Sequence, residues 1–310
     1  MRRYVEIAQD NRHLRADHGF LVIEDSANSD AELGRVPFSD IAAVIARGHG
    51  ISYTNGVLVR LAQQSIPLVL VNHLYQVEGM LLTHQGNSLQ AHRYEAQIAA
   101  SRPTNKRLWS QLVRAKVLQQ ATVLEVIGKS PDKLRALAKR VTSGDETNVE
   151  AQAARVYWPQ LFGRSFRRDR GGPHPNGALN YGYTILRATT ARSVLAAGLH
   201  PTIGIHHSND SNSMRLVDDL VEPFRPFIDL QCWQIWQEKA SELESTHKSQ
   251  LVEVMTQGLS TSLGISPIGV CVQALATSLT QVYSGEATQL TIPIAQVPQD
   301  ARRYVDRDSH

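Results

Sequence analysis

The first 85 residues alternate between short apolar runs and turn-forming residues. The runs are rich in β-branched residues, and each predicts a strand: residues 4–8, 20–24, 41–46, 66–71 and 79–83. Pairs such as Asp10-Asn11 supply turns between them. One amphipathic helix interrupts this region, because the potential caps at residues 52–55 precede Val57 and Leu61 at helical spacing.

From about residue 87 the apolar positions follow the period of a helix. The segments with this period predict helices at residues 88–101, 105–127, 133–141, 148–161, 178–197, 214–238, 251–257 and 267–283. Pro103 marks a break between the first two helices, and Gly198 is a candidate C-cap. A loop rich in Arg and Gly, residues 163–177, lacks the spacing of a phosphate-binding P-loop.

These patterns predict an α+β fold, with a small β-rich N-terminal domain followed by a larger all-α C-terminal domain. The expected divisions are a β-rich domain (1–85), a linker or helix (86–104), an α-helical domain (105–285) and a C-terminal tail (286–310). A hydrophobic content of 42% with 20% charged residues suits a chain with a sizeable core and excludes global disorder.

Neither cysteine indicates a zinc ribbon or a disulfide framework. Cys232 and Cys271 lie in apolar surroundings and outside any CxxC pair. The N-terminal sequence lacks the apolar run of a signal peptide. The longest fully apolar run, residues 66–71, is far shorter than a membrane span. We therefore expect a cytoplasmic protein.

Positive charge is concentrated in two stretches, although the formal net charge is only +3. Residues 102–140 contain ten Lys and Arg against two acids, and residues 164–170 contain four Arg against one Asp. Such stretches suit a polyanion, but each could also be a solvated surface. Within the first stretch, we expect Trp109 to belong to the core rather than to stack on bases.

The chemistry-bearing residues gather in residues 204–226, GIHHSNDSNSMRLVDDLVEPFRP. Asp219 and Glu222 lie at i and i+3 on a predicted helix, and two carboxylates on one face repel each other unless a cation lies between them. Alternatively, acids near a helix N-terminus complement the helix dipole, which is the interpretation we favour for Asp218. A preceding histidine, His206 or His207, would complete a mixed nitrogen and oxygen set that suits Mg²⁺ or Mn²⁺ better than structural zinc.

Glu150 is the best candidate for a third acid. It lies in the first turn of a predicted helix that is otherwise lined with Ala, Val, Tyr, Trp and Leu. Spacing alone leaves open the alternative that Glu150 only complements the helix dipole.

Three segments together resemble the CRISPR-associated spacer-acquisition integrase family (the Cas-one endonucleases). They are NVEAQAARVYWPQLFG (148–163), NGALNYGYTIL (176–186), and GIHH (204–207) followed by DDLVEPFRP (218–226). The order and spacing of these segments match the family pattern over nearly the whole chain, and the DLxEPFRP motif is most similar to the type II branch.

The resemblance implies a metal-dependent DNA endonuclease and strand-transfer integrase that uses Mg²⁺ or Mn²⁺. It carries the metal ligands over to Glu150, His207 and Glu222, with Asp219 in contact with the metal directly or through water. The family pattern GxxH selects His207, but the histidine doublet leaves His206 as an alternative. The C-terminal domain would then be catalytic, and the N-terminal domain would form a homodimer.

The resemblance also implies partners: double-stranded DNA, both as the fragment to be integrated and as the CRISPR repeat, a small CRISPR-associated subunit that bridges two homodimers, and a type II effector nuclease. The residues that we expect to bind DNA phosphates are Lys106, Arg107, Arg114, Lys116, Arg164, Arg167, Arg168 and Arg170. Two alternatives remain open on the residues alone. One is a metal-dependent phosphodiesterase acting on RNA or nucleotides, and the other is a DNA-binding scaffold without enzymatic activity.

Overall fold

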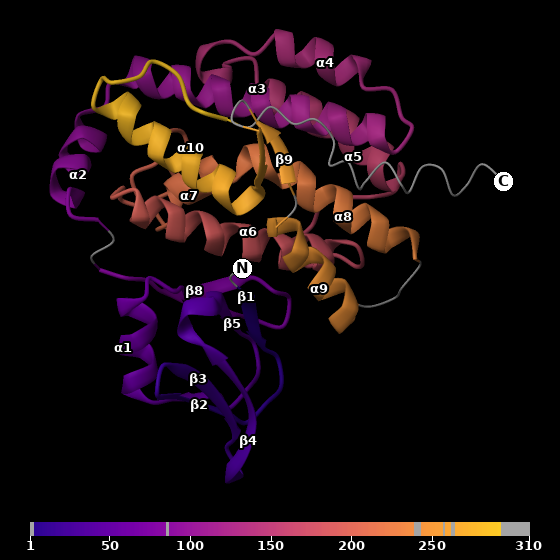
Figure 1. The fold of residues 1–310 in the computed structure, drawn as a ribbon. Coiled ribbons are helices and arrows are strands. Elements are labelled where there is room, and N and C mark those ends of the chain that lie inside the picture. Colours follow the sequence, from indigo (N-terminus) through magenta and orange to yellow (C-terminus); the bar gives the residue numbers. More distant parts are fainter. Residues whose placement is uncertain (1–2, 85–86, 239–242, 257, 262–263, 293–310) are drawn as a thin grey trace. The chain divides into compact units, whose positions relative to one another are not determined.

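The computed structural model describes residues 3–84, 87–238, 243–256, 258–261 and 264–292. The chain divides into two compact units, Met1–Ser88 and Leu89–His310 (Figure 1). The first unit carries most of the strands, and the second is predominantly helical.

The N-terminal unit contains two four-stranded sheets. In the first, three parallel strands are followed by an antiparallel one, in the order β1 (Arg3–Ile7), β5 (Ile41–Ala46), β7 (Leu68–Val71) and β8 (Val77–Leu81). The second sheet has the order β4 (Asn28–Pro37), β3 (Phe20–Asp25), β2 (Arg12–Asp17) and β6 (Ser52–Tyr53). A short 3₁₀ turn, η1 (Phe38–Asp40), leads into β5.

The predicted helix of this unit is confirmed as α1 (Asn55–Gln63). The Thr54 side chain caps it by accepting a hydrogen bond from the backbone N–H of Val57. The helix buries Val57 and Leu61 in a core that also contains Leu14. The hydrophobic pattern therefore identified the local element and its inward face.

The hydrophobic pattern missed strands β2, β4 and β6. Strand β2 is the clearest case, because its sequence RHLRAD is mostly polar. Its charged side chains pair with acids of the neighbouring strand β3: Arg12 lies 3.0 Å from Asp25, and Arg15 lies 2.7 Å from Glu24. Cross-strand ion pairs thus stabilise a strand that apolar alternation does not reveal.

The C-terminal unit is built around long helices. Its helices are α2 (Gln90–Ala99), α3 (Arg102–Val126), α4 (Asp132–Lys139), α5 (Val149–Phe162), α6 (Asn176–Ala196), α7 (Arg215–Leu220), α8 (Arg225–Gln237), α9 (Ser245–Glu253) and α10 (Ile268–Tyr283). Short 3₁₀ turns are η2 (Ser143–Asp145), η3 (Glu222–Phe224) and η4 (Val254–Thr256). Within the segment predicted as a linker or helix, the structure thus contains α2 and the start of α3.

Helix α6 is the central helix of this unit, because most of its side chains are buried. At Gly182 an added Cβ atom would lie 2.4 Å from Cγ2 of Ile228 on α8. The absent side chain allows α6 and α8 to pack closely. Among the described residues, no helix has the length and apolar content to cross a membrane.

Three details differ from the predictions for this unit. Helix α3 begins before Pro103, which occupies the first turn, where proline costs no hydrogen bond. The predicted single helix over residues 214–238 is split into α7, η3 and α8 around Pro223. The unit is also not entirely helical, because β9 (Gly258–Thr261) and β10 (Gly264–Pro267) form an antiparallel pair. Residues 293–310 of the predicted tail lie outside the described residues.

Candidate active site

Two acidic side chains converge on one lysine in the helical unit. The Lys116 Nζ atom, from α3, lies 2.6 Å from Oε1 of Glu150 and 2.5 Å from Oε2 of Glu222. The Glu222 side chain is 3% exposed and that of Lys116 only 12%, whereas that of Glu150 is 31% exposed. The structure therefore brings together two of the predicted site residues, which are 72 positions apart in the sequence.

The start of α5 fixes the position of Glu150. Asn148 caps the helix by accepting a hydrogen bond from the backbone N–H of Ala151. The buried Asp145 carboxylate accepts two more, from the backbone N–H groups of Val149 (2.8 Å) and Glu150 (3.0 Å). These bonds satisfy donors that a helix N-terminus otherwise leaves unpaired. The carboxylate of Glu150 thus projects from a well-anchored first turn.

Glu222 is a buried carboxylate held between two cations. Its Oε1 lies 3.2 Å from Arg225, and its Oε2 faces Lys116. Burial alone would raise the pKa of Glu222, but the charges of Arg225 and Lys116 outweigh it, so the pKa is lowered. Burial likewise opposes the charged form of Lys116, yet Glu222 and Glu150 together raise the pKa of Lys116. The carboxylate of Glu222 and the ammonium of Lys116 thus stabilise each other's charged forms.

Asp219 holds the loop that carries the histidines. Its fully buried carboxylate accepts hydrogen bonds from the backbone N–H groups of Ile205 (2.6 Å), His206 (3.1 Å) and His207 (3.2 Å). It also lies 2.7 Å from Nδ1 of His207. Four donor groups thus surround this one carboxylate.

The same contact orients the His207 imidazole. With Nδ1 hydrogen-bonded to Asp219, Nε2 is the nitrogen left for another ligand. The Asp219 hydrogen bond raises the pKa of His207 against the effect of burial, and the charge of Glu222 adds to the rise. The Glu222 charge acts on the imidazole and the imidazole acts on Glu222, so the two groups belong to one electrostatic cluster.

The two histidines of the doublet have different surroundings. The ring of His206 stacks flat on Trp109, with ring centroids 4.2 Å apart and planes 2° apart. Trp109 is itself buried, as expected, and contacts His207 edge-on at 5.8 Å. His207 is thus the histidine that is bound to Asp219 and influenced by Glu222, and its selection as a metal ligand over His206 stays a prediction.

The side chains of Glu150, Glu222 and His207 are of the chemical types that bind a hard divalent cation. Two carboxylates and one imidazole are available, and Oε2 of Glu222 is buried with no aligned hydrogen bond among the described residues. Within that same part of the chain, no three His, Cys, Asp or Glu side chains are close enough together to hold an ion. The Lys116 ammonium lies where a cation shared by Glu150 and Glu222 would lie, so Lys116 would have to move for such a cation to enter.

Comparison with known proteins bears directly on this arrangement. A family model described as CRISPR associated protein Cas1 matches residues 5–258. The chain belongs to the Cas1 family. A relative from Neisseria meningitidis named CRISPR-associated endonuclease Cas1 is 35% identical over 219 residues, which cover 70% of this chain and 72% of the relative. The family resemblance seen in the motifs is confirmed.

Solved structures show the same fold. A casposase bound to integration product has a TM-score of 0.79 at 19% identity, covering 99% of this chain and 98% of the casposase chain. A chain of a Cas6-RT-Cas1–Cas2 complex has a TM-score of 0.76 at 17% identity, covering 96% of this chain and 36% of that chain. The mixed architecture, strand-rich at the N-terminus and helical in the C-terminal part, is therefore that of known Cas1 proteins.

Two residues expected to bind DNA on the Cas1 surface lie elsewhere. Lys116 is part of the acidic cluster and pairs with two carboxylates. Arg168 turns inward, where it donates hydrogen bonds to Oδ1 of Asn176 (3.0 Å) and Oδ1 of Asn180 (2.8 Å). Both cations therefore already have protein partners in the structure, and Lys116 could contact a phosphate only after leaving the two carboxylates.

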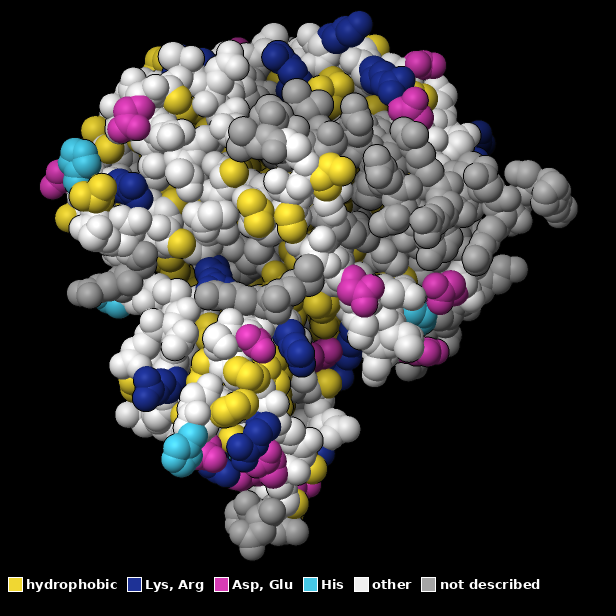
Figure 2. Space-filling model, viewed as in Figure 1, with side chains coloured by type: hydrophobic (Ala, Val, Ile, Leu, Met, Phe, Trp, Pro, Cys, Tyr) yellow, Lys and Arg dark blue, Asp and Glu magenta, His cyan; other side chains and the backbone are white. Residues whose placement is uncertain are grey.

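The other predicted DNA-binding residues remain on the surface. Arg164, Arg167 and Arg170 are exposed in the loop between α5 and α6. On α3, Arg107 and Arg114 are exposed, whereas Lys106 pairs with Glu146 at 2.8 Å. Figure 2 shows Lys and Arg side chains over the α3 and α4 region interleaved with acidic ones. The helical stretch is thus partly neutralised, and the loop carries the denser exposed positive charge.

A second buried network lies beside the acidic cluster. The Tyr183 hydroxyl donates a hydrogen bond to Asp229, which is 1% exposed. The guanidinium groups of Arg168 and Arg225 lie 5.5 and 5.0 Å from the centre of the Tyr183 ring. Because Arg225 also contacts Glu222, this network links the basic loop to the acidic cluster.

We expect the stability of this network to depend on pH through Asp229. Burial raises the pKa of Asp229 from 3.8 to about 6, against the lowering effects of the Tyr183 hydrogen bond and Arg225. A raised folded-state pKa favours the protonated fold, so stability is lost as pH rises from about 4 through 6. Asp229→Asn stays neutral and keeps an acceptor oxygen. We therefore expect the difference in melting temperature, native protein minus Asp229→Asn, to decrease as the pH rises from 4 to 7. A difference that stays constant would contradict this assignment.

Sequence reasoning missed the roles of Lys116 and Arg225. One signal for Lys116 was available, because it is a charged residue beside Val113 and Val117 on a helix that buries most of one face. Arg225 follows Glu222 by three positions, a spacing that permits an ion pair along a helix. Neither signal specifies that both cations meet the same carboxylate.

Proposed function

We propose that this member of the Cas1 family is a metal-dependent DNA integrase and endonuclease of CRISPR adaptation. In the proposed reaction, the 3′-hydroxyl of a short DNA fragment attacks a phosphodiester at a CRISPR repeat, so that the fragment is inserted as a new spacer. The observation that carries the proposal is the cluster of Glu150, Glu222 and the Asp219-oriented His207 in a chain whose relatives are named endonucleases. The casposase neighbour, described as bound to integration product, supports strand transfer.

Glu150, Glu222 and Nε2 of His207 would hold a Mg²⁺ or Mn²⁺ ion. When bound, such an ion polarises the phosphate and stabilises the charge that develops during transfer. Glu222 is fixed by Arg225, and Glu150 by the anchored first turn of α5. Asp219 keeps Nδ1 of His207 engaged and so leaves Nε2 as the nitrogen that would bind the ion. Lys116, once released from the carboxylates, carries a positive charge that can pair with the scissile phosphate.

We propose that the active assembly contains two homodimers bridged by a small CRISPR-associated subunit. Two strand ends must be joined, so one active site is not enough for a complete insertion. The neighbour described as a Cas6-RT-Cas1–Cas2 complex supports a subunit of this kind. In an organism with a type II system, the effector nuclease would be a further partner.

Integration of a labelled DNA fragment into a supercoiled plasmid tests the proposal. We expect labelled plasmid to form with Mg²⁺ or Mn²⁺ and not with EDTA. Cleavage of RNA or nucleotides without integration would instead identify a different phosphodiesterase. DNA binding with no metal-dependent strand transfer, measured with the bridging subunit present, would identify a scaffold. Either result overturns the proposal.

We expect the loop between α5 and α6 to contact DNA phosphates through Arg164 and Arg167. The double variant Arg164→Gln/Arg167→Gln should weaken binding similarly for different DNA sequences. The slope of log affinity against log salt should fall by about two, roughly one for each arginine that no longer pairs with a phosphate. Fluorescence anisotropy over a salt series measures this slope. Arg60→Gln, an exposed helical arginine in the other unit, is the matched control, and an unchanged slope in the double variant would exclude the loop from the DNA interface.

A further inference from the structure

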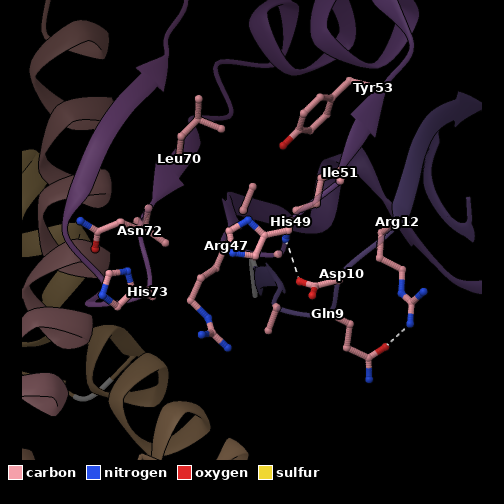
Figure 3. Close-up of a pocket in the computed structure, with 15 residues that line it drawn as sticks. Gln9, Asp10, Arg12, Arg47, His49, Ile51, Tyr53, Leu70, Asn72 and His73 are labelled. Carbon is pink, nitrogen blue, oxygen red and sulfur yellow. Dashed lines mark hydrogen bonds between the residues drawn. The ribbon is translucent and has the colours of Figure 1, made fainter.

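A cavity of about 890 Å³ lies within the N-terminal unit and is lined by residues of that unit alone (Figure 3). It lies beyond the carboxyl ends of the parallel strands β1, β5 and β7. Gln9 and Asp10 follow β1, residues 47–51 follow β5, and Asn72 and His73 follow β7. The carboxyl ends of parallel strands are the usual place for a ligand in an open sheet, and this volume is within the range of small-molecule sites.

The backbone around the cavity is closely fitted. At Gly48 an added Cβ atom would lie 2.2 Å from the carbonyl oxygen of Gln9, so only glycine allows the β5 turn to approach the β1 turn. The two turns are also joined by hydrogen bonds. The His49 N–H donates to Oδ1 of Asp10 at 2.8 Å, and the Asn11 N–H donates to the carbonyl of His49 at 2.8 Å. The cavity therefore has a defined wall.

Two arginines, Arg12 and Arg47, line the cavity against one acid, Asp10, so the charged lining favours an anion. Arg47 has only a distant ion pair, with its Nε atom 3.9 Å from Glu6, and its guanidinium lies over the ring of Tyr75. Its buried Nε atom has no hydrogen-bond partner in the part of the chain that the structure describes. His49 and His73 are exposed at the same strand ends and add further nitrogen donors (Figure 3). Arg47 is thus a cation with spare donors, which suits a phosphate group.

Part of the lining is apolar or aromatic. Ile51 and Tyr53 line the cavity beside Leu70, whose side chain is 41% exposed despite lying on a central strand. The apolar surface can bind a planar hydrophobic group, and the neighbouring guanidinium can bind an anionic group of the same ligand. A nucleoside phosphate combines the two.

We propose that this cavity binds a nucleoside phosphate, with the phosphate at Arg47 and the base against Ile51, Tyr53 and Leu70. The ligand chemistry is a base joined to a terminal phosphate, and it is supplied either by a free nucleotide or by the phosphorylated end of a DNA strand. The site does not depend on the acidic cluster, so it can be tested whether or not the protein integrates DNA.

Isothermal titration of the full-length protein with dAMP, 2′-deoxyadenosine and inorganic phosphate tests the proposal, together with a single-stranded decamer bearing a 5′-phosphate or a 5′-hydroxyl. We expect a phosphorylated ligand to bind at least tenfold more tightly than its unphosphorylated counterpart. Binding of dAMP indicates a free nucleotide, and binding of the phosphorylated decamer without dAMP indicates a strand end. The proposal fails if the phosphate does not increase affinity either in the nucleoside or in the decamer.

Two variants locate the binding. Arg47→Gln should weaken the phosphorylated ligand at least tenfold, and Leu70→Glu, which adds a negative charge at an exposed edge of the cavity, should do the same. Arg60→Gln, on the exposed face of α1, should leave affinity unchanged. Melting temperatures of all variants show whether the unit stays folded. Binding that is insensitive to both Arg47→Gln and Leu70→Glu would place the ligand elsewhere and overturn the proposal.

Discussion

Glu150→Gln, His207→Ala and Glu222→Gln should each reduce metal-dependent integration at least about a hundredfold. Loss of a group that only orients a metal ligand typically costs 10- to 100-fold, so loss of a ligand should cost no less. For Asp219→Asn we expect a loss of integration activity within that 10- to 100-fold range, because Asp219 acts through the His207 imidazole and the backbone of its loop. Labelled-fragment integration into plasmid measures all four variants.

His206→Ala is the matched control for His207→Ala. The two histidines are adjacent, yet His206 stacks on Trp109 and His207 binds Asp219. We expect His206→Ala to keep activity within a few-fold of the native protein. Melting temperature and DNA affinity should be measured for each variant, since Glu222 is buried between two cations. Full activity in all three ligand variants would refute the catalytic assignment, and inactivity of His206→Ala alone would reverse the choice of histidine.

Lys116→Met should destabilise the metal-free protein and increase its response to metal. In EDTA, the ammonium is the cation that Glu150 and Glu222 share. Removing one partner of a buried ion pair typically costs about 3–5 kcal/mol of unfolding free energy. The cost here should be near the low end, because Glu150 is partly exposed and Glu222 keeps Arg225. A lower melting temperature in EDTA reports this loss.

Mn²⁺ should then raise the melting temperature of Lys116→Met more than that of the native protein. Without the ammonium, the ion meets two carboxylates and no competing cation, so binding to the folded state is tighter and stabilises it further. Lys106→Met is the control, because Lys106 lies on the same helix and pairs with a single exposed acid, Glu146. An equal or smaller Mn²⁺ response in Lys116→Met would show that Lys116 and the metal do not compete for this position.

Local patterns in the sequence predict some elements of this structure and miss others. Local signals in the sequence identified most helices, including α1, whose cap lies among the candidates at residues 52–55, and α5. They did so because a cap and an amphipathic face depend on residues three or four positions apart. The same signals overlooked β2, whose partners on β3 are fixed by cross-strand ion pairs. They also overlooked the break at Pro223, although proline lacks the N–H group that a continuous helix requires.

The sequence by itself determined the residue types of the site, Glu150, His207, Asp219 and Glu222, and the family to which the chain belongs. Only the tertiary structure decided how they are arranged. Lys116 contacts Glu150, which lies 34 positions further along the chain. The same ammonium also contacts Glu222, which lies on a third segment. Asp219 binds the loop behind His207 and leaves Glu222 to Lys116 and Arg225. Such contacts depend on how α3, α5 and the turn after α7 pack together, and no local pattern in the sequence records that packing.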